Sequence, residues 1–449
     1  MIYFSEKQIQ EYIWNARDDF SELLAEQHDI ELHEFKDDLS DVTAKLLMRN
    51  KIKKRLSDLY SKLYGMKLIG YEVPLEQNSN STIRADFLAV FPDDTGLAVV
   101  ELKKSNQTER QAFTELLAYS NHMTTLFPAM TRDDSIYVLI SPMETRIARD
   151  AVIQSLTFDN RSIVALVPRF TDPQDITTLR LHLWVPSESE LSSFSNIAFR
   201  EENFSVCKLS WEYDPGRWDA EKGKSPAEYL VNQFDNVSSL AAQHMEEIGI
   251  HGFTYCSQLW PELSDALPYT NSLVLVGLNP YAVGSVQYLM GMRTNEDDEI
   301  PDPNMYVPHI SELIEKLGVG ELYESNSEVL ESLHRIWNSQ LFRVGKKVID
   351  VATKNTDGKY IGIEYGFMDW GTYQRSLLED VLCHNFAIRS TGLMRHLYTD
   401  ILNLDYEICK EFGLENHPIH GDMPYLGVDF LNSQMYFREF ISRMFYSES

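Results

Sequence analysis

Cysteine is scarce in this chain of 449 residues. The four cysteines lie far apart in the sequence: Cys207, Cys256, Cys383 and Cys409. They form no C-x-x-C pair, so neither a zinc site nor a disulfide framework is indicated. The chain also lacks any run near the roughly 18 apolar residues of a membrane span, and its first residues lead into a charged helix rather than a signal peptide. We therefore expect a soluble, cytoplasmic protein with no membrane partner.

Basic residues are the second shortage. The chain has 40 Lys and Arg residues against 68 Asp and Glu residues, which gives a formal net charge of −28. This balance weighs against a nucleic-acid enzyme, because nonspecific affinity for DNA comes largely from neutralisation of phosphates by Lys and Arg. The charge is uneven, however. Residues 1–43 contain twelve acidic and three basic residues, and a basic run follows them.

The basic run lies on a helix that we expect at residues 42–64, where leucines and an isoleucine recur on one side. Its candidate nucleic-acid-binding residues are Arg49, Lys51, Lys53, Lys54 and Arg55. Two interpretations stay open. These side chains contact nucleic-acid phosphates, or they form a solvated helix face.

The segment at residues 84–104 contains two apolar runs joined by a turn around residues 93–94. In an antiparallel hairpin the indices of paired residues have a constant sum, so this turn pairs Asp86 with Glu101. Glu101 and Lys103 are two residues apart and share a face of the second strand. The sequence therefore predicts that two carboxylates and one ammonium group converge.

These groups suit metal-dependent hydrolysis of a phosphodiester. Mg²⁺, or Mn²⁺ in its place, prefers oxygen ligands and keeps several waters. Asp86 and Glu101 supply carboxylates, and the backbone carbonyl of Leu102, whose side chain points the other way, can add a third oxygen. A bound metal acidifies a water and stabilises charge on the phosphate, while Lys103 orients the nucleophile or shares in neutralising that charge.

The acid-x-Lys triplet also occurs at residues 34–36, in a highly charged segment, and at residues 357–359, in a turn that contains glycine. Only the triplet at residues 101–103 directly follows an apolar strand that has an aspartate on the strand before it. The alternative is a strand that ends in a solvated Glu and Lys. The arrangement favours an active site.

With Asp86 followed by Glu101-x-Lys103, the segment resembles the core of the PD-(D/E)XK nuclease superfamily. Ala85 takes the place of the usual proline before the aspartate. The resemblance covers about residues 45–170. It implies a restriction-endonuclease-like core with a Mg²⁺-dependent or Mn²⁺-dependent site.

The superfamily places a helix after the motif, and residues 109–125 have a helical pattern. Gln111, Glu115 and Tyr119 recur every four residues and fall near one face. Some branches carry Gln-x-x-x-Tyr on this helix, and here Glu115 stands in the place of that glutamine. The resemblance implies a catalytic role for the three residues, and a polar helix edge is the open alternative. Acids on the first helix join the site in parts of the superfamily, which makes Asp58 a further candidate.

The flanking patterns predict an α/β (α+β) fold with a mixed central sheet flanked by helices. We expect strands at residues 66–75, 135–141, 162–170, 179–185 and 204–213, and a helix at residues 144–156. The expected parts of the chain are an acidic helical segment at 1–44, the nuclease-like core at 45–170, strands and a linker at 171–225, and a C-terminal α+β domain at 226–449. In the first part, Ser5 can cap a helix, and residues 20–24 continue its helical pattern.

In the C-terminal domain we expect helices at residues 227–247, 311–317, 372–386 and 425–445, and strands at residues 272–277 and 360–365. Its many aromatic residues after Tyr365 form a packed core or a surface for self-association. Residues 214–225 are the best candidate linker. The domain's role is sensing, specificity or oligomerisation.

Three further motifs have simple explanations. The acidic segment at residues 295–304 is a solvated loop whose spacing matches no calcium-binding pattern. Residues 221–225 evoke a phosphate loop but lack its upstream glycine. His417 and His420 can chelate a transition metal, although the proline and glycine beside them favour a loop.

These observations together predict a Mg²⁺-dependent DNA endonuclease of a bacterial restriction or phage-defence type. Its expected partners are double-stranded DNA and a second copy of the chain, and the C-terminal domain is a candidate surface for another protein. The alternatives are a noncatalytic interaction protein on a nuclease-like scaffold and an RNA nuclease.

Overall fold

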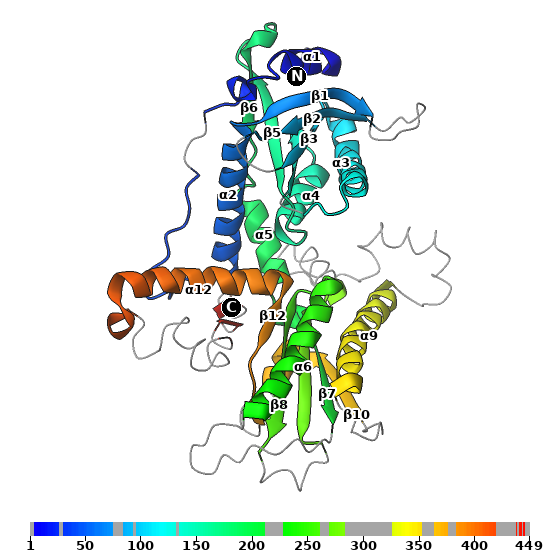
Figure 1. The fold of residues 1–449 in the computed structure, drawn as a ribbon, viewed down its shortest axis with the longest axis vertical. Helices are drawn as coiled ribbons and strands as arrows, with labels where there is room; N and C mark the ends of the chain where they lie inside the picture. Colours follow the sequence, from blue (N-terminus) through cyan, green and yellow to red (C-terminus); the bar gives the residue numbers. More distant parts are fainter. Residues whose placement is uncertain are drawn as a thin grey trace, which may run out of the picture. The chain divides into compact units, whose positions relative to one another are not determined.

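The computed structural model describes residues 4–26, 30–74, 84–92, 96–131, 134–211, 228–260, 269–282, 326–352, 363–375 and 383–418, together with 437, 440, 441, 443 and 444. The chain forms two compact units (Figure 1). The first contains residues 1–34 and 48–192, and the second contains residues 35–47 and 193–449.

A six-stranded mixed sheet forms the centre of the first unit (Figure 1). Its strands, in spatial order, are β1 (Lys67–Pro74), β2 (Arg84–Val90), β3 (Leu97–Leu102), β4 (Ser135–Ile140), β5 (Ile163–Phe170) and β6 (Leu179–Leu183). The pairs β1–β2, β2–β3 and β5–β6 are antiparallel, and β3–β4 and β4–β5 are parallel. This topology confirms the predicted mixed sheet.

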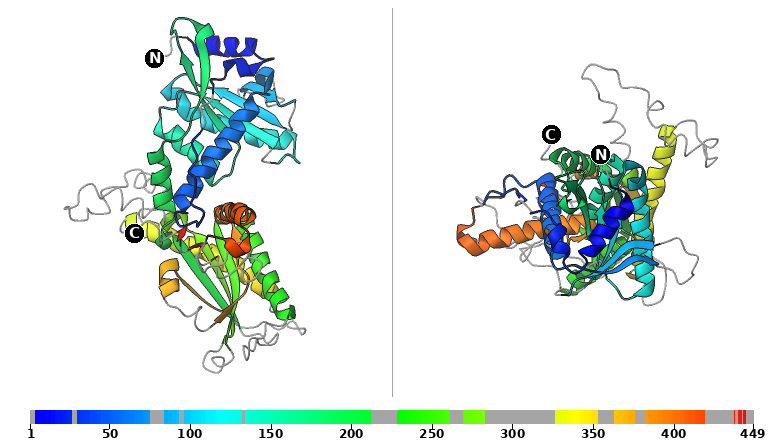
Figure 2. Two further views of the ribbon diagram at one scale, coloured as in Figure 1. Left: turned by 90° about the vertical axis from the view of Figure 1, so that its left-hand side faces the viewer. Right: turned by 90° about the horizontal axis from the view of Figure 1, so that it is seen from above.

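Helices connect the parallel strands, because a parallel pair cannot be joined by a tight turn. Helix α3 (Asn106–Leu126) joins β3 to β4, and α4 (Arg146–Thr157) joins β4 to β5. Helix α2 (Ala44–Leu63) precedes β1 and packs beside the sheet (Figure 2). Its buried residues share one core cluster with alternate residues of the strands, among them Leu59, Tyr60 and Leu63 from α2 and Phe87, Val100 and Val138 from the sheet.

Helix α1 (Glu6–Asn15) begins at Ser5, whose hydroxyl accepts a hydrogen bond from the Gln8 amide in a capping box. This confirms the predicted cap. Ile9 and Ile13 are fully buried in the core cluster of the first unit. The expected helical continuation at residues 20–24 is wrong. The structure has a single 3-10 turn, η1 (Phe20–Leu23), followed by a bridge from Leu24 to β6, because one turn is enough to bury these apolar side chains.

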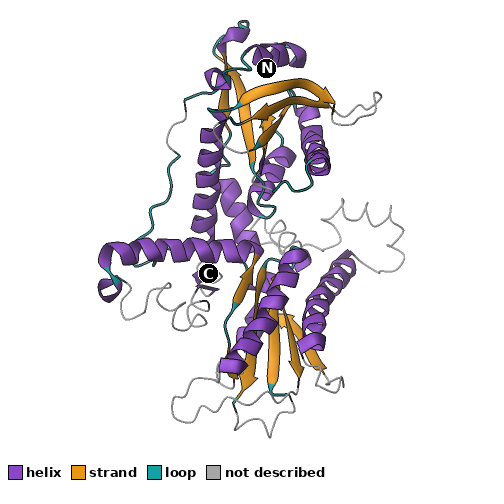
Figure 3. Ribbon diagram, in the orientation of Figure 1, coloured by secondary structure: helices purple, strands orange, loops and turns teal. Residues whose placement is uncertain are grey.

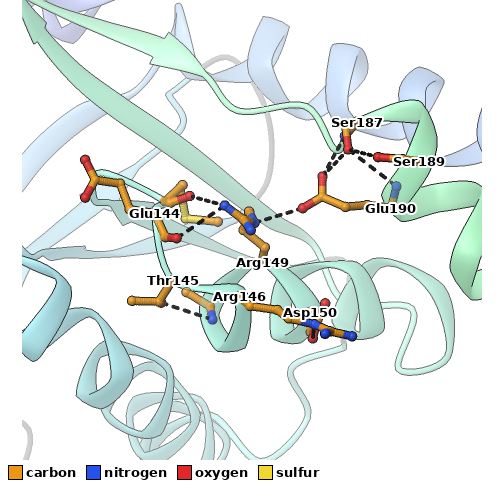
Figure 4. A network of polar contacts seen from close by, with 10 residues as sticks. Glu144, Thr145, Arg146, Arg149, Asp150, Ser187, Ser189 and Glu190 are labelled. Atoms are coloured by element: carbon orange, nitrogen blue, oxygen red, sulfur yellow. Dashed lines mark hydrogen bonds and ion pairs between the residues drawn. The ribbon is translucent and has the colours of Figure 1, made fainter. Parts of the chain in front are cut away.

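A polar network joins the start of α4 to the segment that leads into α5 (Glu188–Ala198) (Figure 4). The Ser187 hydroxyl and amide donate to Oε2 of Glu190 at 2.6 and 2.8 Å. The other Glu190 oxygen forms an ion pair with Arg149, 2.8 Å from its Nε, and another nitrogen of Arg149 donates to the carbonyl oxygens of Met143 and Glu144. Arg149 therefore fixes the chain that follows β4.

The second unit is built on an antiparallel sheet (Figure 3). Its strands, in spatial order, are β10 (Ile363–Asp369), β7 (Phe204–Trp211), β9 (Asn271–Leu278), β8 (Gly252–Leu259) and β11 (Cys383–Asn385), and β12 (Arg389–Thr391) also pairs with β8. Helices α6 (Glu228–Glu247) and α9 (Asn326–Ala352) pack on one face. On the other face, Phe253 contacts the rings of Trp370 and Phe437 at centroid distances of 5.2 and 5.0 Å. The described C-terminal aromatics thus serve largely as core, and the segment at 171–225 is divided, with β6 in the first sheet and β7 in the second.

Among its described residues, the second unit also contains α10 (Trp370–Arg375), α12 (Gly392–Phe412) and the short 3-10 turns η4 (Glu201–Asn203) and η8 (Leu414–Asn416). The 3-10 turn η3 (Ile176–Thr178) belongs to the first unit. The helix expected at residues 372–386 is wrong, because α10 ends at Arg375 and residues 383–385 form β11 instead. The edge of β8 offers backbone pairing to these residues, and that pairing overrides their helical pattern. The expectations at residues 214–225, 221–225, 295–304 and 311–317 and most of 425–445 lie outside the described residues.

Within the part of the chain that the structure describes, no helix combines the length and apolar character needed to cross a bilayer.

Candidate active site

The β2–β3 hairpin places Asp86 opposite Glu101. The ladder runs from Val90 paired with Leu97 to Phe87 paired with Val100, so each pair has the same index sum. The next pair in this register is Asp86 with Glu101. The observed ladder confirms the predicted register, although the turn at residues 93–95 lies outside the described residues.

Lys103 and Glu115 complete a chain of charges on the same face. Nζ of Lys103 lies 2.5 Å from Oε1 of Glu101 and 2.8 Å from Oε2 of Glu115 on α3. Glu101 is 2% exposed and Lys103 is 9% exposed. The Lys103 amide donates to the carbonyl oxygen of Ile140 at 2.8 Å, which extends the pairing of β3 with β4 and holds the lysine backbone in place. The structure thus brings the predicted Glu101, Lys103 and Glu115 together.

Asp86 is held by two donors. Its Oδ1 accepts from Nε2 of Gln10 at 2.6 Å, and its Oδ2 accepts from the Leu102 amide at 2.7 Å. Gln10 lies on α1 and is 7% exposed. One turn earlier on the same helix, Oε2 of Glu6 accepts from the Lys104 amide at 3.3 Å. Helix α1 therefore supplies polar groups to the site.

Sequence reasoning missed Gln10. The available signal was its spacing, because Glu6 and Gln10 are four residues apart and share a helix face next to the buried Ile9 and Ile13. A polar pair of this kind beside an apolar stripe is common on any helix. Only the fold shows that it faces Asp86.

The two carboxyl groups are difficult to ionise in this environment. Burial raises the pKa of Asp86 to about 6, although the Leu102 amide and Lys103 act in the opposite direction. Burial, the charge of Asp86 and a hydrogen bond with Glu115 raise the pKa of Glu101 to about 9. Burial lowers the pKa of Lys103, but its contacts with Glu101 and Glu115 outweigh that effect and raise it. The cluster therefore holds more acid than its single ammonium group neutralises.

This excess of acid fits a divalent cation. Oε2 of Glu101 is buried and accepts no hydrogen bond from the described residues. Asp86 and Glu101 belong to no described group of three His, Cys, Asp or Glu ligand atoms within 4.8 Å of one another. Two carboxylates are still enough for Mg²⁺, which keeps several of its waters. Binding of the Leu102 carbonyl to a metal stays a prediction. The described contacts of Leu102 are its pairing with Ile140 on β4, the hydrogen bond that its amide donates to Asp86, and the packing of its buried side chain.

The remaining predicted residues of α3 differ in their placement. Tyr119 is 3% exposed, and its hydroxyl donates to the carbonyl oxygen of Arg84 at 2.5 Å. This bond ties α3 to the start of β2, so Tyr119 supports the strand that carries Asp86. Gln111 is exposed on α3, two turns before Tyr119.

The basic residues of α2 make contacts within the first unit. Glu188 lies 3.1 Å from Nε of Arg49 and 2.7 Å from Nζ of Lys53. Arg55 donates to Asn160, including its carbonyl oxygen at 2.9 Å. Of the predicted nucleic-acid-binding residues, Lys54 is exposed and Lys51 is half-buried. Arg49, Lys53 and Arg55 therefore stabilise the unit, and a nucleic-acid contact by this helix stays a prediction.

Asp58 also lies on α2 and is exposed. No contact with Asp86 or Glu101 is described for it. Its membership of the site stays a prediction.

Comparison of the chain with protein-family models, with curated proteins and with solved structures finds no match.

Proposed function

We propose that the chain is a metal-dependent nuclease of the PD-(D/E)XK type that hydrolyses phosphodiester bonds in DNA, in a bacterial restriction or phage-defence role. The observation that carries the proposal is the register of the hairpin. Continued by one pair beyond Phe87 and Val100, this register puts Asp86 opposite Glu101, and Lys103 lies 2.5 Å from Glu101. The buried Glu101, the half-buried Asp86 and one ammonium group are what the chemistry of a Mg²⁺-dependent nuclease requires.

The order of elements supports the same proposal. A helix, a strand, an antiparallel hairpin, a second helix and a parallel strand follow one another as α2, β1, β2–β3, α3 and β4. The candidate residues lie at the end of β3 and on the neighbouring β2 and α3. This is the arrangement that the resemblance implies.

Asp86 and Glu101 would hold the metal. Two carboxylates together carry two negative charges, which favours a divalent cation over a monovalent one. The bound metal would supply an acidified water and neutralise charge on the phosphate. Lys103 supplies a positive charge from the protein beside that of the metal. Oε2 of Glu115 lies 2.8 Å from its Nζ and holds the ammonium group in position. Gln10 fixes the orientation of the Asp86 carboxylate through its 2.6 Å hydrogen bond.

A noncatalytic protein built on a nuclease-like scaffold is the second candidate. One observation favours it. Each oxygen of Asp86 already accepts a hydrogen bond, and Lys103 is paired with two glutamates, so the cluster is a connected polar network as it stands. A buried network of this kind can also serve only to fix a single fold.

Cleavage assays separate the two candidates. Purified full-length protein is incubated with plasmid, single-stranded DNA and RNA in the presence of Mg²⁺, Mn²⁺ or EDTA. The nuclease proposal expects metal-dependent cleavage of duplex DNA that Glu101→Gln abolishes and that the exposed control Glu144→Gln retains. Cleavage of RNA alone would move the activity to an RNA nuclease, and no cleavage of any substrate would favour the scaffold.

A further inference from the structure

A second cluster of potential ligands lies in the other unit, at the end of α12. Its members are Asp405, Cys409 and His417, and one potential ligand atom from each lies within 4.8 Å of the other two. Asp405 and Cys409 are four residues apart and therefore share a face of the helix. The cluster contains neither Asp86 nor Glu101.

The local sequence folds His417 back towards the helix. Helix α12 ends at Phe412, and Gly413 has a φ of 77°, a left-handed conformation that suits glycine. The 3-10 turn η8 follows, and His417 then has φ −58° and ψ 133°. This extended conformation is favoured by Pro418, because a residue before proline is disfavoured in the helical region. The turn therefore presents the imidazole to the face of α12 that carries Asp405.

Asp405 lies where an apolar residue would be expected. The buried stripe of α12 runs through Leu397 and Ile401 and continues to Asp405, whose side chain is fully buried. The His417 side chain is 2% exposed, and its Nε2 lies 2.9 Å from Oδ1 of Asp405. A buried carboxylate is costly unless it is paired or coordinates a metal. Cys409 adds a sulfur atom that this pair does not require.

We infer that Asp405, Cys409 and His417 form a binding site for a transition-metal ion, with Zn²⁺ as the ion that best suits these ligands. Carboxylate oxygen, thiolate sulfur and imidazole nitrogen are all zinc ligands, and three protein ligands leave the fourth tetrahedral position for water. Ligand atoms about 2.0–2.3 Å from Zn²⁺ lie roughly 3.3–3.8 Å from one another. The observed separations of 2.9 Å to at most 4.8 Å reach this geometry with small movements of the side chains.

The site differs from the chelate that the sequence suggested. His417 and His420 are close in sequence, but the described partners of His417 come from α12, and His420 lies outside the described residues. The spacing of the cysteines indicated no zinc site, because a single cysteine with an aspartate one turn earlier matches no common spacing. A bound ion would link His417, in the segment after α12, to Asp405 and Cys409 on the helix.

The alternative without a ligand is a metal-free Asp405–His417 ion pair beside the Cys409 thiol. The two explanations differ in what they require of Cys409. In the metal site its sulfur is a ligand, so Cys409→Ser weakens metal binding. In the ion pair it has no such function. Because Cys409 is only partly buried, this substitution is compatible with the folded chain.

The test uses full-length protein without a metal-binding tag, in the background Glu101→Gln and with excess Mg²⁺, so that the first unit does not contribute. Zn²⁺ content is measured after dialysis, and Co²⁺ is titrated as a spectroscopic probe. We expect one Zn²⁺ per chain and a Co²⁺ spectrum with a thiolate charge-transfer band. Cys409→Ser removes that band, and both Cys409→Ser and His417→Ala weaken Zn²⁺ binding by more than the roughly 10–100-fold typical of an outer-shell change.

Matched controls carry the same chemical changes elsewhere in the second unit. Cys383→Ser removes another thiol, and Glu411→Gln removes an exposed acid one turn after Glu407 on α12. Both are expected to keep one Zn²⁺ and the Co²⁺ band. Absence of stoichiometric Zn²⁺ after titration, or equal binding in wild type and Cys409→Ser, would overturn the inference and leave the ion pair. Either result is independent of cleavage by the first unit.

Discussion

Replacing Glu101 by glutamine is expected to stabilise the metal-free protein. Glu101 is 2% exposed, and burial raises its pKa from 4.5 to about 9. A carboxyl group whose pKa is higher in the folded state than in the unfolded state lowers the free energy of unfolding. It does so at every pH at which the group is ionised in the unfolded chain and protonated in the folded one. The loss therefore begins as the pH rises above about 4.5 and is complete near pH 9. Glutamine has nearly the same shape and does not ionise.

The size of the effect follows from the pKa difference. Each pH unit above the unfolded pKa corresponds to about 1.4 kcal/mol until the folded pKa is reached. The pKa is 4.5 in the unfolded chain and about 9 in the folded one, so pH 7 lies about 2.5 units into this range. Glu101→Gln should thus raise the free energy of unfolding by roughly 3 kcal/mol at pH 7 and by almost nothing at pH 4. For a unit of this size, the midpoint of thermal unfolding would rise by roughly 6–12 °C at pH 7.

The assay is thermal unfolding in EDTA from pH 4 to pH 9, with Glu144→Gln as the exposed control. Added Mg²⁺ or Mn²⁺ should reverse the order, because the wild type then gains stability from binding that Glu101→Gln lacks. The reasoning would be refuted if Glu101→Gln lowered the unfolding temperature at pH 7, or if its advantage did not grow with pH. Glu101 would then be ionised and stabilised by Lys103 without a metal.

Three other predictions concern the surroundings of the site. Gln10→Ala should leave the chain folded and slow cleavage by roughly 10–100-fold, which is the usual cost of losing a residue that orients a metal ligand. If this variant cleaves at the wild-type rate in a single turnover, Asp86 needs no orienting group. Lys54→Gln should reduce the salt dependence of DNA binding by about one unit of log–log slope, whereas an unchanged slope would make this exposed residue of α2 a solvated side chain. Light scattering should show a dimer or larger oligomer, because an isolated chain of charge −28 binds phosphate poorly. In the described part of the second sheet, β10 is an edge strand, and its Tyr365 is 57% exposed. Tyr365→Asp should shift that oligomer towards monomer, and a monomeric wild type at micromolar concentration would contradict the prediction.

The hairpin was predictable because two local signals agree in it. Residues 87–90 of β2 form an apolar run, the run at Leu97–Leu102 is almost entirely apolar, and the turn between them sets the register. Index arithmetic alone then pairs Asp86 with Glu101, and the observed ladder has the same index sum up to Phe87 with Val100. The flanking strands and helices of the first unit were predictable from the same kind of pattern.

Other parts depend on contacts between distant residues. Gln10 reaches Asp86 from 76 positions away, and Glu188 pairs with Lys53 across 135 positions. Strand β8 was missed because it is buried on both faces yet contains polar residues such as Thr254, whose hydroxyl is satisfied by the Val274 carbonyl oxygen at 2.8 Å. No local period distinguishes such a strand from a loop.

Single-turnover cleavage of duplex DNA in Mg²⁺ by three alanine variants tests the central claim most directly. If Asp86 and Glu101 hold the metal, Asp86→Ala and Glu101→Ala should abolish both Mn²⁺ binding and cleavage. Lys103→Ala should retain Mn²⁺ binding and lose turnover by several orders of magnitude, since its ammonium group acts on the reacting groups. Glu144→Gln should match the wild type in both measurements. Wild-type cleavage by any one of the three alanine variants would contradict the assignment of this site.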